Sequence, residues 1–412
     1  MLRIVRTLKG CLAAAGMLAV ASCGGGAGDS AGASNRTALT LASRDAALHG
    51  QHGPTLTTQN SGTSSSLIAV SAVNRRVVWA SGRFGTFTVT TDGGKTWRPG
   101  VVAGAEGHQF RDVQGVSEKV AYLLAIPSDD GTEGSRIYKT TDGGKSWTLQ
   151  TEGRDAAEFF DCFAFWDSHS AITMVDSVGD QIPVRRTLDG HTWVNIGDRL
   201  APALPGESGF AASGTCAATQ GHRHGWLVTG VPPADVSSPW TTRVHYTTDR
   251  GHSWGVTTVP ITAPGDSFGG GASIAFRDAR HGIVGGGDFG ATGVVPNFAR
   301  SHDGGRTWTL GTPAPVPGAI YGLAYAGDGQ SEDGEDDGRG EHEREREHRR
   351  EHEHAGPIRV VATGHAGSAW SADEGRTWTA FTGLAGFWAV TFADERTGWL
   401  VGEGGEITRI DF

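Results

Sequence analysis

One short motif recurs six times along the chain, and its spacing limits the fold more than any other feature. The copies follow the pattern [S/T]-x-D-x-G-x-[S/T]-W, with one residue deleted in the third copy. They begin at Thr90, Thr140, Thr187, Thr247, Ser301 and Ser371. A motif that returns every fifty residues or so, between short β-rich runs, is typical of a repeat architecture and predicts a β-propeller.

Each copy has the features of a hairpin turn between two antiparallel strands. Its Asp can accept hydrogen bonds from the backbone N–H groups of the turn, and its last Gly supplies a positive φ. Its Trp is large enough to fill apolar space beside the blade. The pattern resembles the Asp-box, also called the BNR repeat, and we refer to each copy as a box. We interpret its Asp and Trp residues as structural: Asp92, Asp142, Asp189, Asp249, Asp303, Asp373, Trp97, Trp147, Trp193, Trp254, Trp308 and Trp378.

The strand pattern predicts one more blade than there are boxes. Seven inner strands can be recognised, the first beginning at Leu67 and the last at Trp388. The last repeat ends at Phe412 with no box after it, whereas residues 55–62 resemble the strand that follows the second box. We therefore predict an all-β fold over residues 54–412. It is a seven-bladed β-propeller of four-stranded antiparallel blades, whose ring is closed by an N-terminal strand in the last blade.

The first residues have the composition of an export signal. Arg3, Arg6 and Lys9 precede an apolar run at residues 11–20, which is too short to cross a membrane as a helix. The run ends in V-A-S-C, which resembles a bacterial lipobox. The resemblance implies a lipoprotein signal peptide at residues 1–22 and an acylated Cys23, and the Gly that follows favours the outer membrane, facing the periplasm. The alternative is an ordinary secretory signal. Residues 23–53, rich in Gly, Ala and Ser, are expected to form a flexible tether.

Two further cysteines, Cys162 and Cys216, remain for the exported part of the chain. Both open the first strand of their repeats, at equivalent positions of adjacent blades. They could form a disulfide between the third and fourth blades, or they could stay as two buried thiols if the strands are too far apart.

A charged insertion at residues 327–356 interrupts the sixth blade. It is rich in Glu, Asp, Arg and His, so it is too polar to pack and is expected to be disordered. Its His348, His352 and His354 could bind a transition metal adventitiously, but a tolerated charged loop is the favoured interpretation, and no metal site or cofactor is predicted.

The boxes and the count of seven blades resemble the photosystem II stability and assembly factor family, over residues 54–412. This resemblance implies a non-enzymatic scaffold that docks onto a protein partner at the membrane or in the periplasm. The net charge of −10 disfavours a nucleic-acid partner.

Enzyme families fit the sequence less well. Sialidases also contain Asp-boxes, but they need an arginine triad, a Tyr nucleophile and an Asp, and the R-I-P motif of their first strand is absent from this sequence. The G-x-G-x-x-G at residues 285–290 and the G-x-S-x-G at 265–269 lack the following helix that their chemistry requires. We assign no catalytic residue. The remaining alternative is an exported hydrolase that acts on glycans.

A candidate ligand face follows from propeller topology, since the loops that lead into inner strands share one face with the loops between second and third strands. We call this the loop face, and the opposite face the box face. The polar residues of the loop face could bind a small polar ligand or a cation, or could form a solvated, ion-paired rim. They are Arg83, Arg111, Asp112, Asp161, Asp176, Asp288, His365 and Glu403, with Glu207 nearby. The hydrolase alternative requires two carboxylates at the separation found in glycosidases, and the candidates are Asp112, Asp161 and Asp288.

Overall fold

The computed structural model describes residues 53–154, 158–327, 356–384 and 386–412. The predicted signal peptide, Cys23, almost all of the predicted tether and almost all of the charged insertion lie outside these residues. No helix among the described residues is long and apolar enough to cross a membrane.

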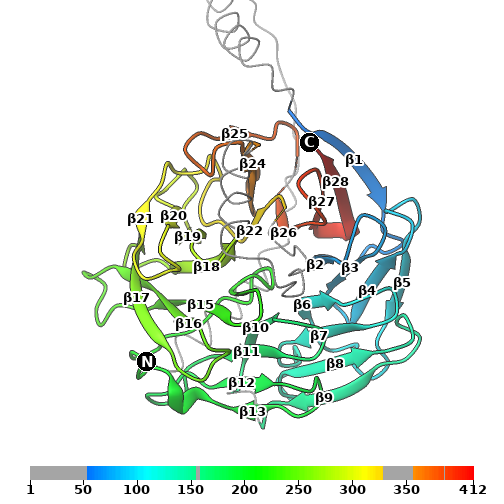
Figure 1. Ribbon diagram of the computed structural model, residues 1–412, viewed down its shortest axis with the longest axis horizontal. Helices are drawn as coiled ribbons and strands as arrows, with labels where there is room; N and C mark the ends of the chain where they lie inside the picture. The colour runs from blue at the N-terminus through cyan, green and yellow to red at the C-terminus, as the bar shows by residue number, and fades with distance from the viewer. Residues whose placement is uncertain (1–52, 155–157, 328–355, 385) are drawn as a thin grey trace, which may run out of the picture. The chain divides into compact units, whose positions relative to one another are not determined.

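Seven four-stranded antiparallel sheets stand around a common axis (Figure 1), which confirms the predicted seven-bladed β-propeller. In every blade the first-named strand is the innermost and the last-named strand is the outermost. Blade one is β2 (Leu67–Ala72), β3 (Val78–Gly82), β4 (Thr86–Thr90) and β5 (Arg98–Val101). Blade two is β6 (Phe110–Gly115), β7 (Ala121–Ala125), β8 (Arg136–Thr140) and β9 (Thr148–Glu152). Blade three is β10 (Phe160–Phe165), β11 (Ala171–Val175), β12 (Val184–Thr187) and β13 (Val194–Asn195).

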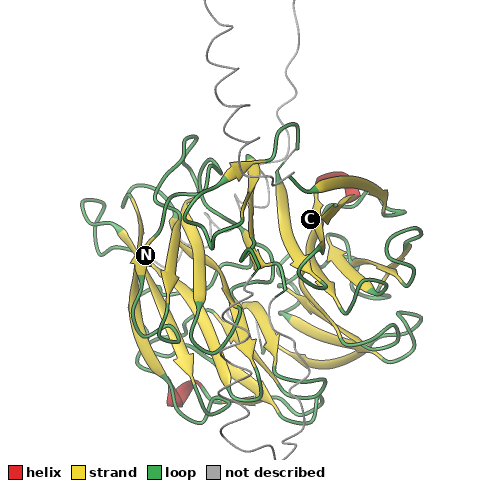
Figure 2. Ribbon diagram, turned by 45° about the horizontal axis from the view of Figure 1, so that its top comes forward, coloured by secondary structure: helices red, strands yellow, loops and turns green. Residues whose placement is uncertain are grey.

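The remaining blades follow the same plan (Figure 2). Blade four is β14 (Ala217–Gln220), β15 (His224–Val231), β16 (Trp240–Thr247) and β17 (Gly255–Ala263). Blade five is β18 (Gly269–Phe276), β19 (Gly282–Asp288), β20 (Phe298–Ser301) and β21 (Thr309–Leu310). Blade six is β22 (Gly322–Tyr325), β23 (Val360–Gly364), β24 (Gly367–Ser371) and β25 (Thr379–Ala380). Blade seven is β26 (Phe387–Phe392), β27 (Thr397–Gly402), β28 (Glu406–Asp411) and β1 (Thr55–Asn60). The short 3-10 helices are η1 (Gly197–Arg199) and η2 (Glu403–Gly405).

Blade seven combines both ends of the described chain, as predicted. The N-terminal strand β1 pairs with β28 and takes the outermost place that β5, β9 and the other strands after boxes occupy. Gln59 of β1 accepts hydrogen bonds through its Oε1 from the indole Nε1 of Trp97 in blade one (3.1 Å) and of Trp399 in blade seven (3.2 Å). One side chain therefore links the two blades where the ring closes.

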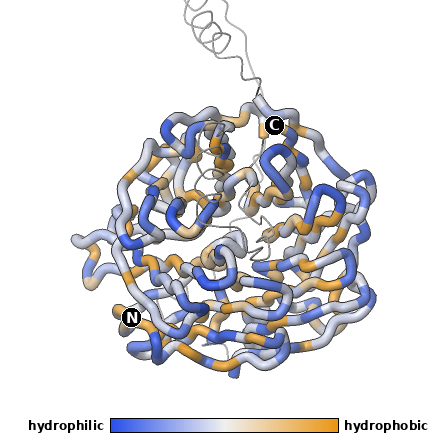
Figure 3. Tube along the Cα trace, in the orientation of Figure 1, coloured by the Kyte–Doolittle hydropathy of each residue, from blue (hydrophilic) through white to orange (hydrophobic). Residues whose placement is uncertain are grey.

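The core consists of apolar layers between neighbouring blades. Hydrophobic residues follow the strands, whereas the connecting loops are mostly hydrophilic (Figure 3). The second strands β3, β7, β11 and β27 are buried along their whole length. Trp79 of β3 is completely buried and meets the box residue Trp147 of blade two edge to face, with 6.1 Å between the ring centroids. Each box Trp of this kind thus fills space between its own blade and the preceding one.

The box turns share one hydrogen-bonded geometry, of which the second copy is an example. Asp142 accepts hydrogen bonds through Oδ1 from the backbone N–H of Ser146 (3.0 Å) and the hydroxyl of Thr140 (2.9 Å), and through Oδ2 from the Ser146 hydroxyl (2.6 Å). The side-chain and backbone hydrogen bonds from Ser146 lower the pKa of Asp142 to about 2. Gly143 and Gly144 have φ values of 78° and 83°, which a side chain would resist. The Asp of each of the other five boxes accepts hydrogen bonds from its own turn in a similar way.

Candidate functional site

Hydrogen bonds between neighbouring loops stabilise the loop face. The backbone N–H of Arg83, between β3 and β4, bonds to the carbonyl of Ser66 ahead of β2 (3.0 Å), and that of Asp176 bonds to Phe159 ahead of β10 (2.9 Å). In blade four, Ser208 and Gly230 bond to each other in both directions. Loops after second strands and loops before inner strands are therefore held side by side, as the topology predicts.

The inner strands contain a β-bulge in five blades, at the second residue in four of them and at the fourth residue of β18 in blade five. The pairing register with the second strand shifts at this point, leaving one extra residue on the inner strand. Bulges re-aim the side chains near them, so these five positions differ in direction from the rest of their strands. They are Ile68, Arg111, Asp161, Ala272 and Trp388. Arg111 and Trp388, from blades two and seven, approach each other: the guanidinium carbon lies 6.0 Å from the indole centroid.

The long loop between β13 and β14 occupies the middle of the ring (Figure 1, green). Three contacts place it there. Ala211 O accepts a hydrogen bond from Arg111 Nη1 of blade two (3.2 Å), the Ser213 hydroxyl donates to Tyr321 O at the start of blade six (2.6 Å), and the hydroxyls of Thr215 and Ser273 of blade five are 2.7 Å apart. We call residues 209–215 the central segment. A segment bonded to blades two, five and six covers the axis on the loop face.

Two anchors flank the central segment. On one side, Glu207 is completely buried and binds the Arg243 guanidinium, His245 Nε2 (3.0 Å) and the Thr229 hydroxyl (2.7 Å). Burial alone would raise the pKa of Glu207, but the hydrogen bond and charge of His245 outweigh it and lower the pKa. Glu207 was expected near the ligand face, but it lies inside blade four because β15 and β16 supply its partners.

On the other side, Cys216 is joined to Cys162 by a disulfide between blades three and four. The Cα atoms are 5.9 Å apart and both side chains are fully buried. Of the two alternatives left open by the sequence, the structure contains the bonded one.

A row of aromatic rings extends from the central segment across blades four to seven. Phe210 of the segment lies 4.9 Å from Phe289, which is 5.3 Å from Tyr321, which is 5.3 Å from Trp388, all measured between ring centroids. Phe268 also contacts Phe210 and Phe289. Phe289 and Trp388 are only half-buried. Because Phe210, Phe268 and Tyr321 are buried, the row exposes Phe289 and Trp388 at the centre of the loop face, an arrangement that no sequence motif indicated.

Arg111 is the cation at the end of this row. Its Nη2 donates to Gln109 Oε1 (2.8 Å), and the amide of Gln109 in turn donates to Asp129 (2.7 Å). Burial lowers the pKa of Arg111 to about 10, and nearby Arg83 contributes in the same direction. At neutral pH it remains a cation, stacked beside Trp388.

The carboxylates predicted for the face mostly serve the scaffold. Asp112 accepts backbone N–H groups of Val113 (2.7 Å) and of Phe163 in the next blade (2.8 Å), and burial raises its pKa well above the ordinary value. Asp288 is buried and accepts from the Ser267 hydroxyl and from the backbone N–H of Gly290. The remaining predicted residues differ in exposure: Asp161 is fully buried, Arg83 and Asp176 are half-buried, and His365 and Glu403 are exposed.

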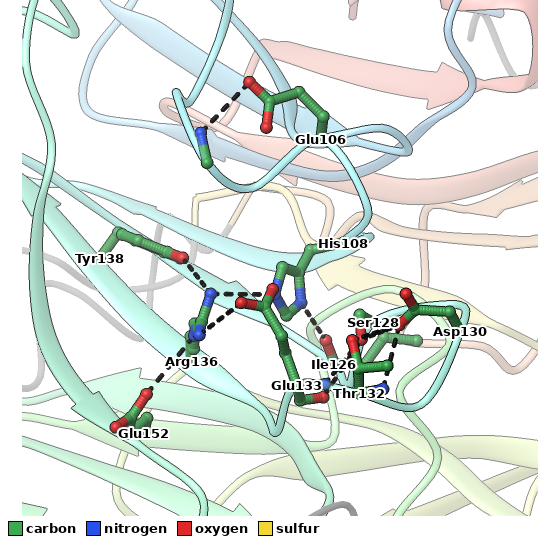
Figure 4. Close-up of polar contacts among 11 residues, drawn as sticks. Glu106, His108, Ile126, Ser128, Asp130, Thr132, Glu133, Arg136, Tyr138 and Glu152 are labelled. Carbon is green, nitrogen blue, oxygen red and sulfur yellow. Dashed lines mark hydrogen bonds and ion pairs between the residues drawn. The ribbon is translucent and has the colours of Figure 1, made fainter.

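The loop between β7 and β8 forms an ordered edge of the loop face (Figure 4). The two ring nitrogens of His108 lie 2.8 Å from Ile126 O and 2.9 Å from a Glu133 oxygen. Arg136 bonds to the other oxygen of Glu133 (2.9 Å) and lies 3.5 Å from a carboxylate oxygen of Glu152. Burial would raise the pKa of Glu133, but Arg136 and His108 lower it. Such a network holds the loop in one conformation before any partner arrives.

Within the described residues, no group of three or more His, Cys, Asp or Glu side chains is placed to hold a metal ion. The histidines of the charged insertion lie outside these residues.

Comparisons with known proteins support the fold. No family model matches the chain, and none of the curated proteins matches it. Among solved structures, it is similar to YCF48 bound to D1 peptide, with a TM-score of 0.54 and 17% identity, covering 88% of this chain and 98% of that one. It is also similar to YCF48 from Cyanidioschyzon merolae, with a TM-score of 0.51 and 13% identity, covering 86% of this chain and 98% of the other. The chain therefore has the propeller fold of YCF48, as its boxes led us to expect.

Proposed function

We propose that this chain is a non-enzymatic binding scaffold, whose loop face holds a segment of a protein partner at a membrane surface. The observation that carries the proposal is the aromatic row beside Arg111 at the centre of that face. Half-buried rings offer apolar contact area at little cost in side-chain entropy, and aromatic and Arg side chains are the usual anchors of protein interfaces.

The central segment determines how a partner would bind. Because this segment bonds to blades two, five and six, it closes the axis, so a partner rests on the face and does not enter a channel. Its two anchors and the network around Glu133 keep the face preorganised, which reduces the entropy lost on binding. The similar fold of YCF48 bound to D1 peptide supports a protein segment as the partner.

Export and anchoring complete the proposal. Their support comes from the sequence: the basic and apolar residues at 1–22 and the lipobox-like run ending at Cys23. An acylated Cys23 would hold the propeller at the periplasmic side of a bacterial membrane, with the outer membrane favoured. Residues 23–53 are long enough to let the face reach a membrane protein.

No observation favours the hydrolase alternative. Glycan hydrolysis by the usual mechanism needs two carboxyl groups that face one substrate across a short gap. Both oxygens of Asp112 are occupied by backbone N–H groups, and Asp288 is occupied by Ser267 and Gly290.

Site-specific photo-crosslinking in the native membrane would test the proposal. A photoreactive residue would replace Val294, exposed on the loop between β19 and β20, or Leu188, exposed on the box face. We expect one abundant protein adduct from position 294 and none of that adduct from position 188. A second substitution, Trp388→Ala, should abolish the adduct, whereas Leu310→Ala, at an exposed site on outer strand β21, should not.

Two outcomes would contradict the proposal. One is an adduct that forms equally from both faces. The other is the absence of any loop-face adduct from a correctly folded and localised protein, since a scaffold without a partner on this face has no function to perform.

A further inference from the structure

The residue after the last glycine of the box is basic in every copy. The six residues are Lys95, Lys145, His191, His252, Arg306 and Arg376, and all six are exposed. The preceding box Asp accepts the backbone N–H of this residue in the third, fourth and fifth copies. The turn geometry therefore fixes where the basic residue stands. Its side chain is exposed, although that of His191 also contacts Gln150 and that of Arg306 donates to Asp303 O.

A second basic position recurs in the hairpins between inner and second strands. Six hairpins are described, and all six carry an exposed basic residue near the tip: Arg76, Lys119, His169, Arg223, Arg280 and Arg396. In five of them the N–H of this residue bonds to a side chain two positions earlier, as Arg280 does to Asp278 (2.7 Å). This is the Asx or Ser turn, which again fixes the place of the basic residue.

Both positions lie on the box face, because the hairpin and the box of one blade are bonded together. The backbone N–H of Gly143 in the second box donates to Lys119 O (2.9 Å), and that of Gly304 in the fifth box donates to Arg280 O (2.8 Å). Blades one and four have the same bond. The box face therefore carries two concentric series of basic side chains, which we call the basic rings.

The cations of the basic rings are free to act on a partner. Among the described residues, the ion pairs of the propeller include none of these twelve side chains. The box Asp residues beside them are held by N–H and O–H groups of their own turns. Exposed acids on the box face include Glu118, Glu395 and the box residue Asp189. The box carboxylates remain charged, as the lowered pKa of Asp142 indicates, so the rings supply the longer and more exposed side chains of this face.

The loop face has the opposite balance. Its loops expose more acids than bases, so the charges of the propeller are sorted between its two faces. The exposed acids of these loops include Glu106, Asp129, Asp130, Asp180, Asp235, Asp266 and Glu403.

We propose that the box face is a docking surface for a membrane rich in anionic phospholipid, with the basic rings lying against the headgroups. Attraction of Lys and Arg to anionic headgroups is additive, and it needs no pocket. The Lys and Arg residues of the rings stand on every blade except blade three, where the two positions are His169 and His191, and this spread suits an extended flat surface. A membrane presents its charge over such a surface, and binding of a polyanionic polymer instead is an outcome that the test below distinguishes.

The path of the chain supports the same orientation. Outermost strands run from the box face to the loop face, and β1 takes the outermost place in blade seven. The first described residues therefore lie at the box face, the side proposed to meet the membrane. The loop face then points away from the lipid and stays open to a partner.

Vesicle sedimentation with the full chain would test the docking surface. The protein would carry Cys23→Ser, so that no acyl chain can form, and the vesicles would be phosphatidylcholine with or without phosphatidylglycerol. We expect binding to require phosphatidylglycerol and to weaken as salt is raised, because salt screens exposed charges. The apolar residues 11–20 meet the same hydrocarbon in both vesicles, but Arg3, Arg6 and Lys9 are also attracted to anionic lipid. The charge-reversal variants keep these residues, so they decide whether the box face itself contributes.

Charge reversal on each face provides the matched pair of variants. Lys95→Glu with Lys145→Glu should weaken binding to the anionic vesicles at least about tenfold, since each cation near such a surface contributes about 1 kcal/mol. Asp180→Lys with Asp266→Lys changes the net charge by the same amount in the other direction, on the loop face. Because that face would point away, we expect no gain in binding. All four side chains are exposed, so thermal unfolding should be unchanged.

Several results would overturn the proposal. They are equal binding to both kinds of vesicle, binding that does not change with salt concentration, unchanged binding of the Lys95 and Lys145 variant, or stronger binding of the Asp180 and Asp266 variant. A further result would show that the surface recognises a polymer instead. In that case the protein binds heparin or DNA, this binding is lost in the Lys95 and Lys145 variant, and phosphatidylglycerol makes no difference to vesicle binding. Since Cys23 is absent from the test protein, failure of vesicle binding is distinct from failure of the lipid anchor.

Discussion

Removal of the disulfide should be the most costly small change in this propeller. The change is Cys162→Ala together with Cys216→Ala, which deletes a bond between residues 54 positions apart in the chain. In the chain-entropy model, a cross-link that closes a loop of about 55 residues stabilises the folded state by about 4 kcal/mol. A domain has about 5–15 kcal/mol of net stability, so this loss is a large share.

The structure also predicts that the central segment is the part of the propeller most affected by loss of the disulfide. Cys216 follows directly on the central segment, whose Ala211, Ser213 and Thr215 bond to blades two, six and five. Without the disulfide, the segment keeps these hydrogen bonds and the Glu207 contacts but loses its covalent anchor, so its amides should exchange with deuterium much faster than those of the second strands. Phe210 should lose its fixed place in the aromatic row for the same reason.

The assay is urea unfolding followed by Trp fluorescence, on the oxidised protein, the protein unfolded and refolded under reductant, and the double variant. We expect the reduced protein and the variant to share one midpoint, well below that of the oxidised protein. Equal midpoints in all three would refute the entropy argument. A loss in the variant alone would show that packing of the sulfur atoms, and not the cross-link, provides the stability.

Three further predictions concern single residues. Gln59→Ala should cost about 2 kcal/mol in unfolding free energy, because two indole N–H groups lose their acceptor. Gln150→Ala, at the equivalent place in β9, should cost less, since its amide bonds to Thr148 O of its own strand and its Oε1 contacts only the exposed His191 ring. Asp112→Ala should lower the free energy of unfolding by about 3 kcal/mol, because it leaves two backbone N–H groups unsatisfied. Asp112→Asn should lower it less, since one acceptor oxygen remains, and equal losses in thermal unfolding would contradict this assignment. The pKa values of Asp142 and Asp249 are lowered to about 2 in the folded protein, so these carboxylates stabilise the fold above about pH 4, and the stabilisation is lost as pH falls toward 2. Asp142→Asn should therefore make the melting temperature fall less steeply across that range, and an unchanged slope would refute the argument.

The fold could be predicted because its main signal is local. Each box determines its own turn through an Asp, a positive-φ glycine and hydroxyl groups within eight residues, so six copies locate six hairpins without any long-range information. The closing strand was predictable for a related reason: Gln59 is placed like Gln150, in a segment that resembles the strand after a box. The structure adds why that residue suits the position, since its Oε1 receives two indoles.

The site was less predictable because it depends on distances between blades. Asp112 lies at the start of its strand, as expected. Its carboxylate accepts the backbone N–H of Phe163 in the next blade, a contact that no local sequence pattern reveals. The path of residues 209–215 across the axis follows from contacts with residues about 100 positions away. The aromatic row left one usable signal: Phe268, Tyr321 and Trp388 all stand where an inner strand begins. The sequence could not decide between disulfide and thiols, because that choice rests on a separation between strands.

The two faces differ in how far a sequence can vary on them, and this difference bears on function. On the box face, a box glycine must donate its N–H to a hairpin carbonyl, as Gly143 does to Lys119 and Gly304 to Arg280, so the repeats keep one geometry and present similar residues. The loop face has a repeated bond only where the strands end, as from Arg83 to Ser66 and from Asp176 to Phe159. Beyond that bond its connections range from a short turn at residues 83–85 to the long loop at 196–216. A face that repeats itself suits a uniform surface such as a membrane, and a face with unlike loops suits one particular protein. The division of labour that we propose therefore follows from the turn chemistry of the boxes themselves.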